Sequence, residues 1–194
     1  VEQPIGDGLR YMGPAHDGRS LWFNVENRNK KDLCLDLKTP EGKEILTKLI
    51  AEADVMTENF RPGVLAKLGF TWEKIHSINP RLILARMSGY GQTGPYSKRA
   101  GYDRVGVGMG GLTFLTGFPD KAPLKPGVSV GDYLVGFATA YGIMVAVYER
   151  DVVGSGEGQE LDCALFEHFN RDRALIVVEQ NVNKPMSKVF KPCG

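Results

Sequence analysis

Apolar and polar positions in the first half of the chain follow two periods in turn, which predicts alternating strands and helices. Residues 33–37 alternate apolar and other side chains, as a half-buried strand does. The next segment places its apolar side chains on one helical face, after Thr39 as N-cap and Pro40 as the first helical residue. The predicted elements of this half are strands at 20–26, 33–37, 54–57 and 81–87, and helices at 40–50, 62–68 and 71–78.

The second half is dominated by one long apolar run. No residue from Tyr133 to Tyr148 is charged, and several are glycine or alanine, which predicts a buried, closely packed helix. The run is shorter than the ~20 residues that a transmembrane helix needs, so we expect no membrane partner. A glycine-rich helix is predicted at 102–115, and a strand at 160–164 precedes a C-terminal helix.

Strands and helices that alternate in this way predict an α/β fold, an open Rossmann-like parallel sheet with flanking helices. Ligands in such folds bind at the carboxyl ends of the strands. The loop at 88–98 is rich in glycine, serine and proline and follows a strand directly, so it is a candidate wall of a binding site. The predicted organisation is one α/β domain at 1–170, followed by a divergent helix and tail at 171–194.

Composition and charge narrow the classes of partner. The 194 residues are 42% hydrophobic, and 24 Lys and Arg stand against 23 Asp and Glu, so no nucleic acid partner is expected. Cys34, Cys163 and Cys193 are far apart and odd in number, which favours reduced thiols in an intracellular protein and no metal site. The first residues, Val1–Pro4, show neither the charged nor the apolar region of a signal peptide, and since they do not begin with Met we expect the chain to be cut at its start. We expect a cytoplasmic protein, or a mitochondrial one if the source is eukaryotic.

Asp132 is the main chemical candidate because it stands where the long apolar helix begins. Free N–H groups and the positive end of the helix dipole stabilise a carboxylate there. Two interpretations are open at this point, a helix N-cap and a functional carboxylate. The histidines are isolated in the sequence, at His16, His76 and His168, so we expect structural or surface roles for them and no histidine base.

Two groups of basic residues are candidates for holding a phosphorylated ligand. One includes Lys38, beside a predicted strand, and the other is Asn59–Gly63 with Lys67, between a strand end and a helix start. Arginine and lysine near helix N-terminal amides suit phosphate, and Phe60 offers a face for an adenine-like ring. Each group alone is typical of a solvated surface, but together at consecutive strand ends they indicate a nucleotide-bearing cofactor.

Seven blocks of this sequence resemble the class III coenzyme A transferases, the CaiB/BaiF family, in order and in spacing. One block would be a weak match, whereas seven in register are specific. The blocks are Leu35–Lys43, Ala53–Gly63, Asn79–Ile83, Gly89–Pro95, Ala100–Asp103, Gly131–Asp132 and Gly156–Asp162.

The resemblance implies a fold, a substrate and a set of site residues. It implies the large domain of such an enzyme, two interlocked subunits, and coenzyme A as an acyl-CoA co-substrate without a metal. It makes Asp132 the catalytic nucleophile. The coenzyme A contacts that it implies are Leu35, Lys38, Asn59, Phe60, Arg61, Lys67, Ala100, Gly101, Tyr102 and Asp103.

The expected activity is transfer of coenzyme A from an acyl-CoA to a carboxylic acid, through an aspartyl anhydride and an aspartyl-CoA thioester. One alternative is an α-methylacyl-CoA racemase of the same fold, but racemases place a histidine base where this chain has Tyr102. The other alternative is an inactive truncated fragment. Members of the family are much longer than this chain and carry a second domain, so we expect the isolated chain to be inactive.

Overall fold

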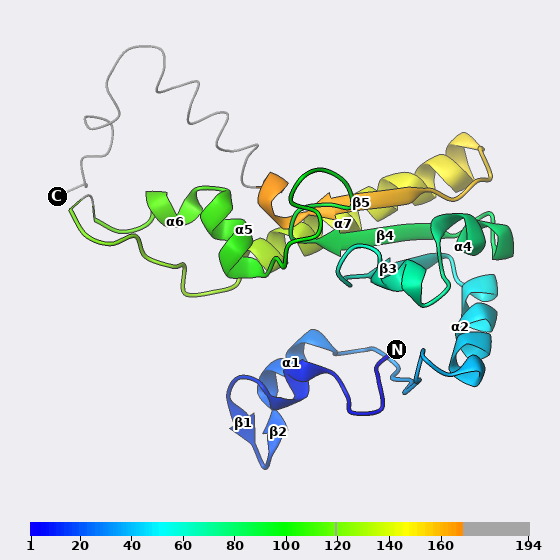
Figure 1. Cartoon of the computed structure of the whole chain (residues 1–194), viewed down its shortest axis with the longest axis horizontal. Coiled ribbons are helices and arrows are strands. Elements are labelled where there is room, and N and C mark those ends of the chain that lie inside the picture. The colour runs from blue at the N-terminus through cyan, green and yellow to red at the C-terminus, as the bar shows by residue number, and fades with distance from the viewer. Residues whose placement is uncertain (119, 169–194) are drawn as a thin grey trace. The chain divides into compact units, whose positions relative to one another are not determined.

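The computed structural model describes residues 1–118 and 120–168, and the chain divides after Glu52 into two compact units. The N-terminal unit is Val1–Glu52, and the sheet unit begins at Ala53. Figure 1 labels the helices and strands of both. The divergent segment predicted at 171–194 lies outside the described residues, as does most of the helix predicted after residue 164.

The N-terminal unit contains short elements. They are a 3-10 helix at Gly8–Tyr11, the antiparallel pair β1 (Ala15–His16) and β2 (Arg19–Ser20), α1 (Leu21–Glu26) and α2 (Pro40–Glu52). The strand predicted at 20–26 is wrong, because this segment is helix α1. The Ser20 hydroxyl accepts a hydrogen bond from the Phe23 N–H at 3.1 Å, so an N-cap starts a helix in a sequence with strand-like composition.

The strand predicted at 33–37 is also wrong. Only Cys34 makes a bridge, in parallel with Glu2, through N–H groups of Glu2 and Leu35. The alternating pattern is present, but among the described residues no second strand continues this pairing, and a strand needs a ladder of partners.

Helix α2 begins as predicted. The Gly42 N–H donates to the Thr39 hydroxyl at 3.1 Å, and Pro40 is the first helical residue. Of the four apolar residues on the predicted face, Leu46 and Ile50 are buried, whereas Ile45 and Leu49 are each 40% exposed. The buried stripe of α2 is therefore narrower than the sequence pattern.

The sheet unit holds a parallel three-stranded sheet in the order β3 (Val55–Glu58), β4 (Ile83–Ser88) and β5 (Glu160–Ala164). Figure 1 shows the three arrows side by side. The turn α3 (Val64–Lys67) and helix α4 (Trp72–Ile78) connect β3 to β4, as predicted. Residues 82–85 are fully buried, the pattern of a central parallel strand. The predicted α/β class with a parallel sheet and flanking helices is confirmed.

The single helix predicted at 102–115 is two helices. α5 (Asp103–Met109) ends before Gly110, and α6 (Leu112–Leu115) begins after Gly111. Gly111 adopts a φ of +88°, a left-handed conformation that breaks the helix and that favours glycine. The glycines that suggested close packing therefore include the one that divides the segment.

The long helix is α7 (Val130–Tyr148), and a π-helical turn at Glu149–Val153 continues it. The prediction that it is buried holds for one face only. Val135, Thr139 and Ala146 are buried, whereas Phe137 and Tyr141 are about three-quarters exposed. The sequence of this helix places apolar side chains on every face, and this pattern predicts burial on all sides. The prediction that this run is too short to span a membrane is wrong, because the helix extends beyond it at both ends. Within the described residues, 130–153 is the one helix long and apolar enough to do so, a property shared by core helices of soluble proteins.

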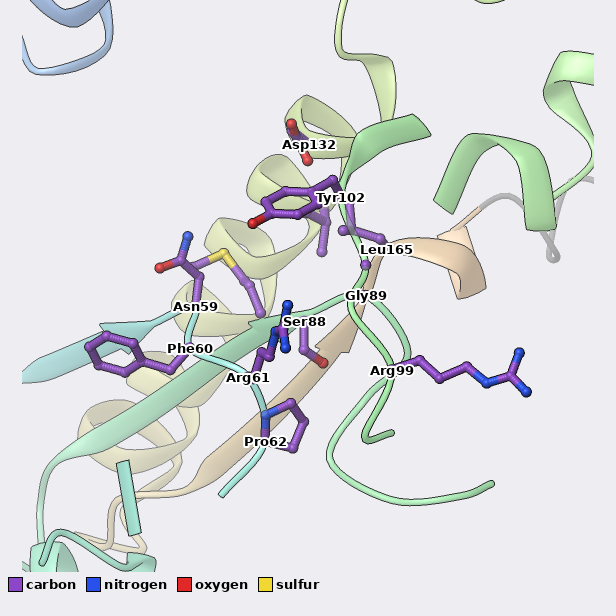
Figure 2. Close-up of a pocket in the computed structure, with 13 residues that line it drawn as sticks. Asn59, Phe60, Arg61, Pro62, Ser88, Gly89, Arg99, Tyr102, Asp132 and Leu165 are labelled. Atoms are coloured by element: carbon purple, nitrogen blue, oxygen red, sulfur yellow. The ribbon is translucent and has the colours of Figure 1, made fainter. Parts of the chain in front are cut away.

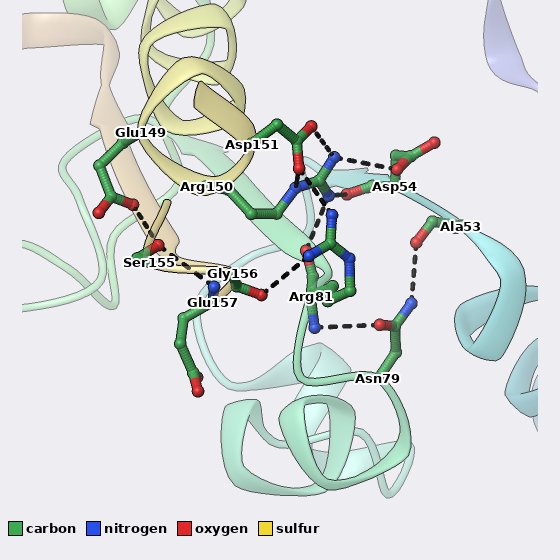
Figure 3. Close-up of polar contacts among 10 residues, drawn as sticks. All are labelled: Ala53, Asp54, Asn79, Arg81, Glu149, Arg150, Asp151, Ser155, Gly156 and Glu157. Carbon is green, nitrogen blue, oxygen red and sulfur yellow. Dashed lines mark hydrogen bonds and ion pairs between the residues drawn. The ribbon is translucent and has the colours of Figure 1, made fainter. Parts of the chain in front are cut away.

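Arg150 fixes the C-terminal end of this helical segment to the amino end of the sheet (Figure 3). Its side chain is 4% exposed and forms ion pairs with Asp54 and Asp151 at 3.0 and 2.8 Å. It also donates to the Arg81 carbonyl at 2.9 Å, just before β4. A single guanidinium thus joins three segments that are far apart in the sequence, and it sets where α7 crosses the sheet.

Candidate active site

A pocket of about 350 Å³ lies at the carboxyl ends of all three parallel strands. Asn59 follows β3, Ser88 ends β4, and Leu165 follows β5. The first turns of α7 and the segment before α5 complete the wall. The residues that line it are Asn59, Phe60, Arg61, Pro62, Met87, Ser88, Gly89, Arg99, Gly101, Tyr102, Asp132, Val135 and Leu165 (Figure 2).

Asp132 is the third residue of α7, and its side chain is exposed at the pocket. The interpretation of Asp132 as an N-cap is wrong, because Ser129 occupies that position. Burial by the surrounding protein raises the pKa of Asp132 above its ordinary value, and repulsion from the Asp103 carboxylate adds to the rise, while Lys125 opposes it.

Asp103 anchors the start of α7. Its side chain is 5% exposed, and one carboxylate oxygen accepts a hydrogen bond from the Gly131 N–H at 2.8 Å. The other oxygen is buried without a hydrogen-bond partner. This arrangement places a second carboxylate behind Asp132, which accounts for the repulsion between them.

Two glycines let the chain close around the pocket. A Cβ on Gly89 would lie 2.4 Å from the Gly101 Cα, so only glycine allows these backbones to approach so closely. The neighbouring Tyr102 is 75% exposed. Figure 2 shows its ring between Asp132 and the Asn59 side chain. The loop after β4 is thereby held against the segment before α5, and Tyr102 forms part of the wall.

The structure brings together six of the residues predicted for the site: Asn59, Phe60, Arg61, Gly101, Tyr102 and Asp132. The other five do not line the pocket. Ala100 and Lys67 are exposed nearby in the sequence, and Asp103 is buried. Leu35, buried, and Lys38, exposed, belong to the N-terminal unit.

Several residues that line the pocket were not predicted from the sequence. The loop at 88–98 was predicted as a wall, and its Ser88 and Gly89 do line the pocket. Leu165 and Arg99 were not predicted. Leu165 directly follows β5, so its position could have found it, because residues just after parallel strands meet at the same edge of the sheet. Arg99 lies beyond the loop at 88–98, and no such signal marks it.

The described residues contain no group of three or more His, Cys, Asp or Glu side chains placed to hold a metal ion. Among the residues that line the pocket, Asp132 is the only carboxylate, and none is His, Cys or Lys. The Ser88 hydroxyl accepts a hydrogen bond from the Gly91 N–H at 2.9 Å. The chemistry available at this site is therefore that of one exposed carboxylate beside a tyrosine and two arginines.

Comparison with known proteins gives a consistent set of relatives. The sequence profile of CoA-transferase family III matches residues 1–187. Succinyl-CoA--D-citramalate CoA-transferase of Chloroflexus aurantiacus is 45% identical over 169 residues, 86% of this chain and 42% of that protein. Formyl-CoA:oxalate CoA-transferase of Rhodopseudomonas palustris is 47% identical over 159 residues, 81% of this chain and 37% of that protein.

A solved structure agrees. The crystal structure of a CAIB/BAIF family protein from Brucella suis superposes with a TM-score of 0.87 and 38% sequence identity, over 95% of this chain and 50% of that one. The chain therefore spans about two fifths of the length of the two curated relatives and half of the solved chain.

Proposed function

This chain belongs to CoA-transferase family III, and on that premise we propose that it carries the nucleophile of a coenzyme A transfer, Asp132. The reaction moves coenzyme A from an acyl-CoA to a carboxylic acid. The single observation that carries the proposal is that Asp132 is the only carboxylate among the described residues lining the pocket at the strand ends. An exposed carboxylate is the group that this chemistry needs.

The first half of the proposed reaction frees the donor acid. The Asp132 carboxylate attacks the thioester carbonyl, the C–S bond breaks, and a mixed anhydride and the coenzyme A thiolate result. The thiolate then attacks the aspartyl carbonyl of the anhydride. This step releases the donor as a carboxylate and leaves an aspartyl-CoA thioester.

The second half runs the same steps in reverse with the acceptor. The acceptor carboxylate attacks the aspartyl-CoA carbonyl, which expels the thiolate and forms a new anhydride. The thiolate attacks the acceptor's carbonyl and restores free Asp132. No proton is transferred in either half, so no histidine base is needed. A raised pKa increases the basicity of the carboxylate, which favours attack once the group is ionised.

The loop after β3 is the proposed binding surface for coenzyme A. Phe60 is 41% exposed and offers an open ring face, and Arg61 beside it supplies a positive charge for phosphate. The family resemblance implies further contacts at Leu35, Lys38 and Lys67, and we propose them although none of the three lines the pocket. The named substrates of the two curated relatives are succinyl-CoA, D-citramalate, formyl-CoA and oxalate. We propose acyl-CoA esters of short carboxylic acids as the substrate class here.

The test is turnover of Asp132→Asn in the full-length enzyme that contains this chain, since the substitution keeps the shape of the side chain and removes its charge. We expect transfer to fall by on the order of 10³-fold or more, the scale seen when a covalent nucleophile is removed. The matched control is Asp120→Asn, an exposed aspartate outside the pocket, which should keep normal turnover. Near-normal transfer by the Asp132 variant would refute the assignment.

A racemase is the second candidate to be tested, because it shares the fold. Racemisation removes the proton on the α-carbon, whereas coenzyme A transfer leaves it in place. Incubation with a 2-methylacyl-CoA in deuterated water distinguishes them. We expect no deuterium at the α-carbon, because Tyr102 stands where racemases have histidine; incorporation would favour the racemase.

We also propose that the whole protein acts as a homodimer of interlocked subunits and works in the cytoplasm. The dimer proposal rests on the family resemblance, and the cytoplasmic one rests on cysteine usage that fits reduced thiols. Sedimentation of the native protein tests the first, since a monomer at micromolar concentration would contradict it.

A further inference from the structure

Two loops that wall the pocket are each tied down by a carboxylate from a strand. Glu58 ends β3, and one of its oxygens accepts a hydrogen bond from the Phe60 N–H at 2.7 Å. Asp162 lies in β5, and one of its oxygens accepts from the Gln92 N–H at 2.7 Å. The first contact shapes the loop that carries Asn59 to Pro62, and the second shapes the loop after β4.

Arg86 lies between these two carboxylates in the sheet. In the register of the parallel strands, it stands opposite Glu58 on one side and Asp162 on the other. Its Nε lies 3.6 Å from the second Glu58 oxygen. Its Nη1 donates a hydrogen bond to the Gln92 side-chain oxygen, with 3.4 Å between the two atoms. The same Nη1 pairs with Glu160 at 3.1 Å. One arginine on the central strand thus pairs with the anchor of the first loop, Glu58, and contacts the second loop through the Gln92 side chain.

Burying the Glu58 carboxylate is energetically unfavourable, which indicates that its charge has a role in this position. Its side chain is only 5% exposed, and burial raises its pKa, although the Phe60 N–H and Arg86 oppose the rise. Well-packed apolar residues are often at least as stable as a buried ion pair. They could not, however, accept the Phe60 N–H.

We propose that Glu58, which Arg86 pairs with, and Asp162 are positioning residues that hold the two pocket loops in the conformation that receives coenzyme A. This inference rests on the proposed function of the same pocket. A purely structural role would affect only the stability of the sheet. A positioning role predicts that, when either carboxylate is removed, the loops loosen and coenzyme A binding weakens while the sheet stays folded. Neither carboxylate lines the pocket, so Glu58 and Asp162 act through the loop backbone.

The control comes from the same cluster. Glu160 pairs with Arg86 but has no hydrogen bond to a loop backbone among the contacts described. Glu160→Ala therefore removes an ion pair to the same arginine without releasing a loop. Glu58→Gln is the conservative variant, because its amide oxygen can still accept from the Phe60 N–H.

The first measurement is hydrogen exchange of the native protein without ligand. In Glu58→Ala we expect faster exchange at residues 59–62, and in Asp162→Ala at residues 89–92, each by roughly 10-fold or more, because a bonded amide is released. Glu160→Ala should leave both segments unchanged, and Glu58→Gln should restore most of the protection. Unchanged exchange in both alanine variants would overturn the proposal.

The second measurement is the dissociation constant of free coenzyme A. Glu58→Ala should weaken binding by about 10-fold, equivalent to about 1.4 kcal/mol, and raise KM more than it lowers kcat. An effect no larger than that of Glu160→Ala would overturn the role in binding. If the wild-type protein binds no coenzyme A, the proposed function fails, and the exchange data still decide whether the loops are held as described.

Asp162→Ala keeps the test decisive if Glu58→Ala fails to fold. Asp162 is exposed, so its truncation leaves no cavity in the core. Its expected effect is confined to the loop after β4, with a smaller loss of coenzyme A affinity, of several-fold. A folded Asp162→Ala protein with normal exchange at 89–92 and normal affinity would contradict the proposal without reference to Glu58.

Discussion

Two arginines, one in each unit, have the same number of carboxylate partners and very different surroundings. In the N-terminal unit, Arg10 pairs with Glu2 and Asp32, and its side chain is 34% exposed. In the sheet unit, Arg150 pairs with Asp54 and Asp151 and is 4% exposed. Water screens the first set and is excluded from the second guanidinium. The number of ion pairs therefore does not distinguish the two arginines. The burial of the guanidinium does, because a buried charge holds its partners in place.

The same contrast separates the predicted site residues. Those that line the pocket all belong to the sheet unit, at the ends of strands that buried side chains and Arg150 hold in register. Leu35 and Lys38 belong to the N-terminal unit, in which the strands β1 and β2 are only two residues long each. We infer that the sheet unit provides the fixed part of the site.

The largest expected effect on stability comes from Arg150→Met. Removing this guanidinium leaves the Arg81 carbonyl and two carboxylates without their shared donor. We expect a loss of about 2–3 kcal/mol in the free energy of unfolding, below the range for fully enclosed pairs because Asp54 remains largely exposed. Denaturant unfolding measures it. Arg10→Met is the matched control, and an equal loss there would break the comparison.

Coenzyme A affinity tests whether both units contribute to binding. Arg61→Ala should weaken binding several-fold, because each lost phosphate contact is worth on the order of 1 kcal/mol. Lys38→Ala should have a similar effect if the N-terminal unit supplies a contact. In both variants the loss should be larger at low salt, where screening is weakest. Lys48→Ala, an exposed lysine paired with Glu44, is the control. Calorimetry showing no loss in either variant would contradict the placement of coenzyme A.

The pH dependence of transfer reports on Asp132. Since the nucleophile must be ionised, the rate should fall as pH drops through the raised pKa, with a midpoint above that of an ordinary aspartate. Asp103→Asn removes the repelling charge and should move this acid limb to lower pH. A limb that stays in place would show that Asp103 does not act on Asp132.

The same shift has a stability consequence with a defined sign. A carboxyl whose pKa is raised in the folded state favours folding below its unfolded pKa, and it loses that contribution as pH rises through the folded pKa. Asp132→Asn should therefore be slightly more stable than the wild type at neutral pH, with the difference vanishing in acid. A thermal-unfolding midpoint that falls at neutral pH would contradict this.

The smallest expected effect is in the N-terminal unit. Hydrogen bonding to Arg10 lowers the pKa of Glu2 to about 2. Its contribution is therefore present above the ordinary glutamate pKa and is lost as pH falls from that value toward about 2. Glu2→Gln should remove this contribution at neutral pH and, with it, the loss of stability as the pH falls. Because Arg10 and Glu2 are only partly buried, we expect a small loss, and a loss at neutral pH as large as that of Arg150→Met would mean that the two units differ less than their burial indicates.

Local signals in the sequence predicted what local interactions determine. Thr39 and Thr71 cap their helices as expected, and the last strand occupies 160–164 as predicted. Residues 20–26 and 33–37 were assigned wrongly because strand formation depends on a partner strand, which no local pattern reveals. The exposed face of α7 was missed for a related reason, since an apolar sequence does not say what covers it.

The site follows the same division. The resemblance identified Asp132 and the Asn59–Arg61 loop, and strand order explains why they meet at one pocket. The anchoring of these loops by Glu58 and Asp162 depends on the register of three parallel strands. That register arises from packing, so it was not predictable from the spacing of the blocks.

The most direct test of the central claim is to trap the aspartyl intermediate. The native protein is incubated with an acyl-CoA and hydroxylamine, which attacks an aspartyl thioester or anhydride and leaves a hydroxamate on the carboxyl group. Peptide mass spectrometry then locates the modification. We expect it on Asp132 and nowhere else, with Asp103 as the nearby unmodified control. Modification of a different residue, or ongoing transfer without any modified peptide, would contradict the proposal that Asp132 is the nucleophile.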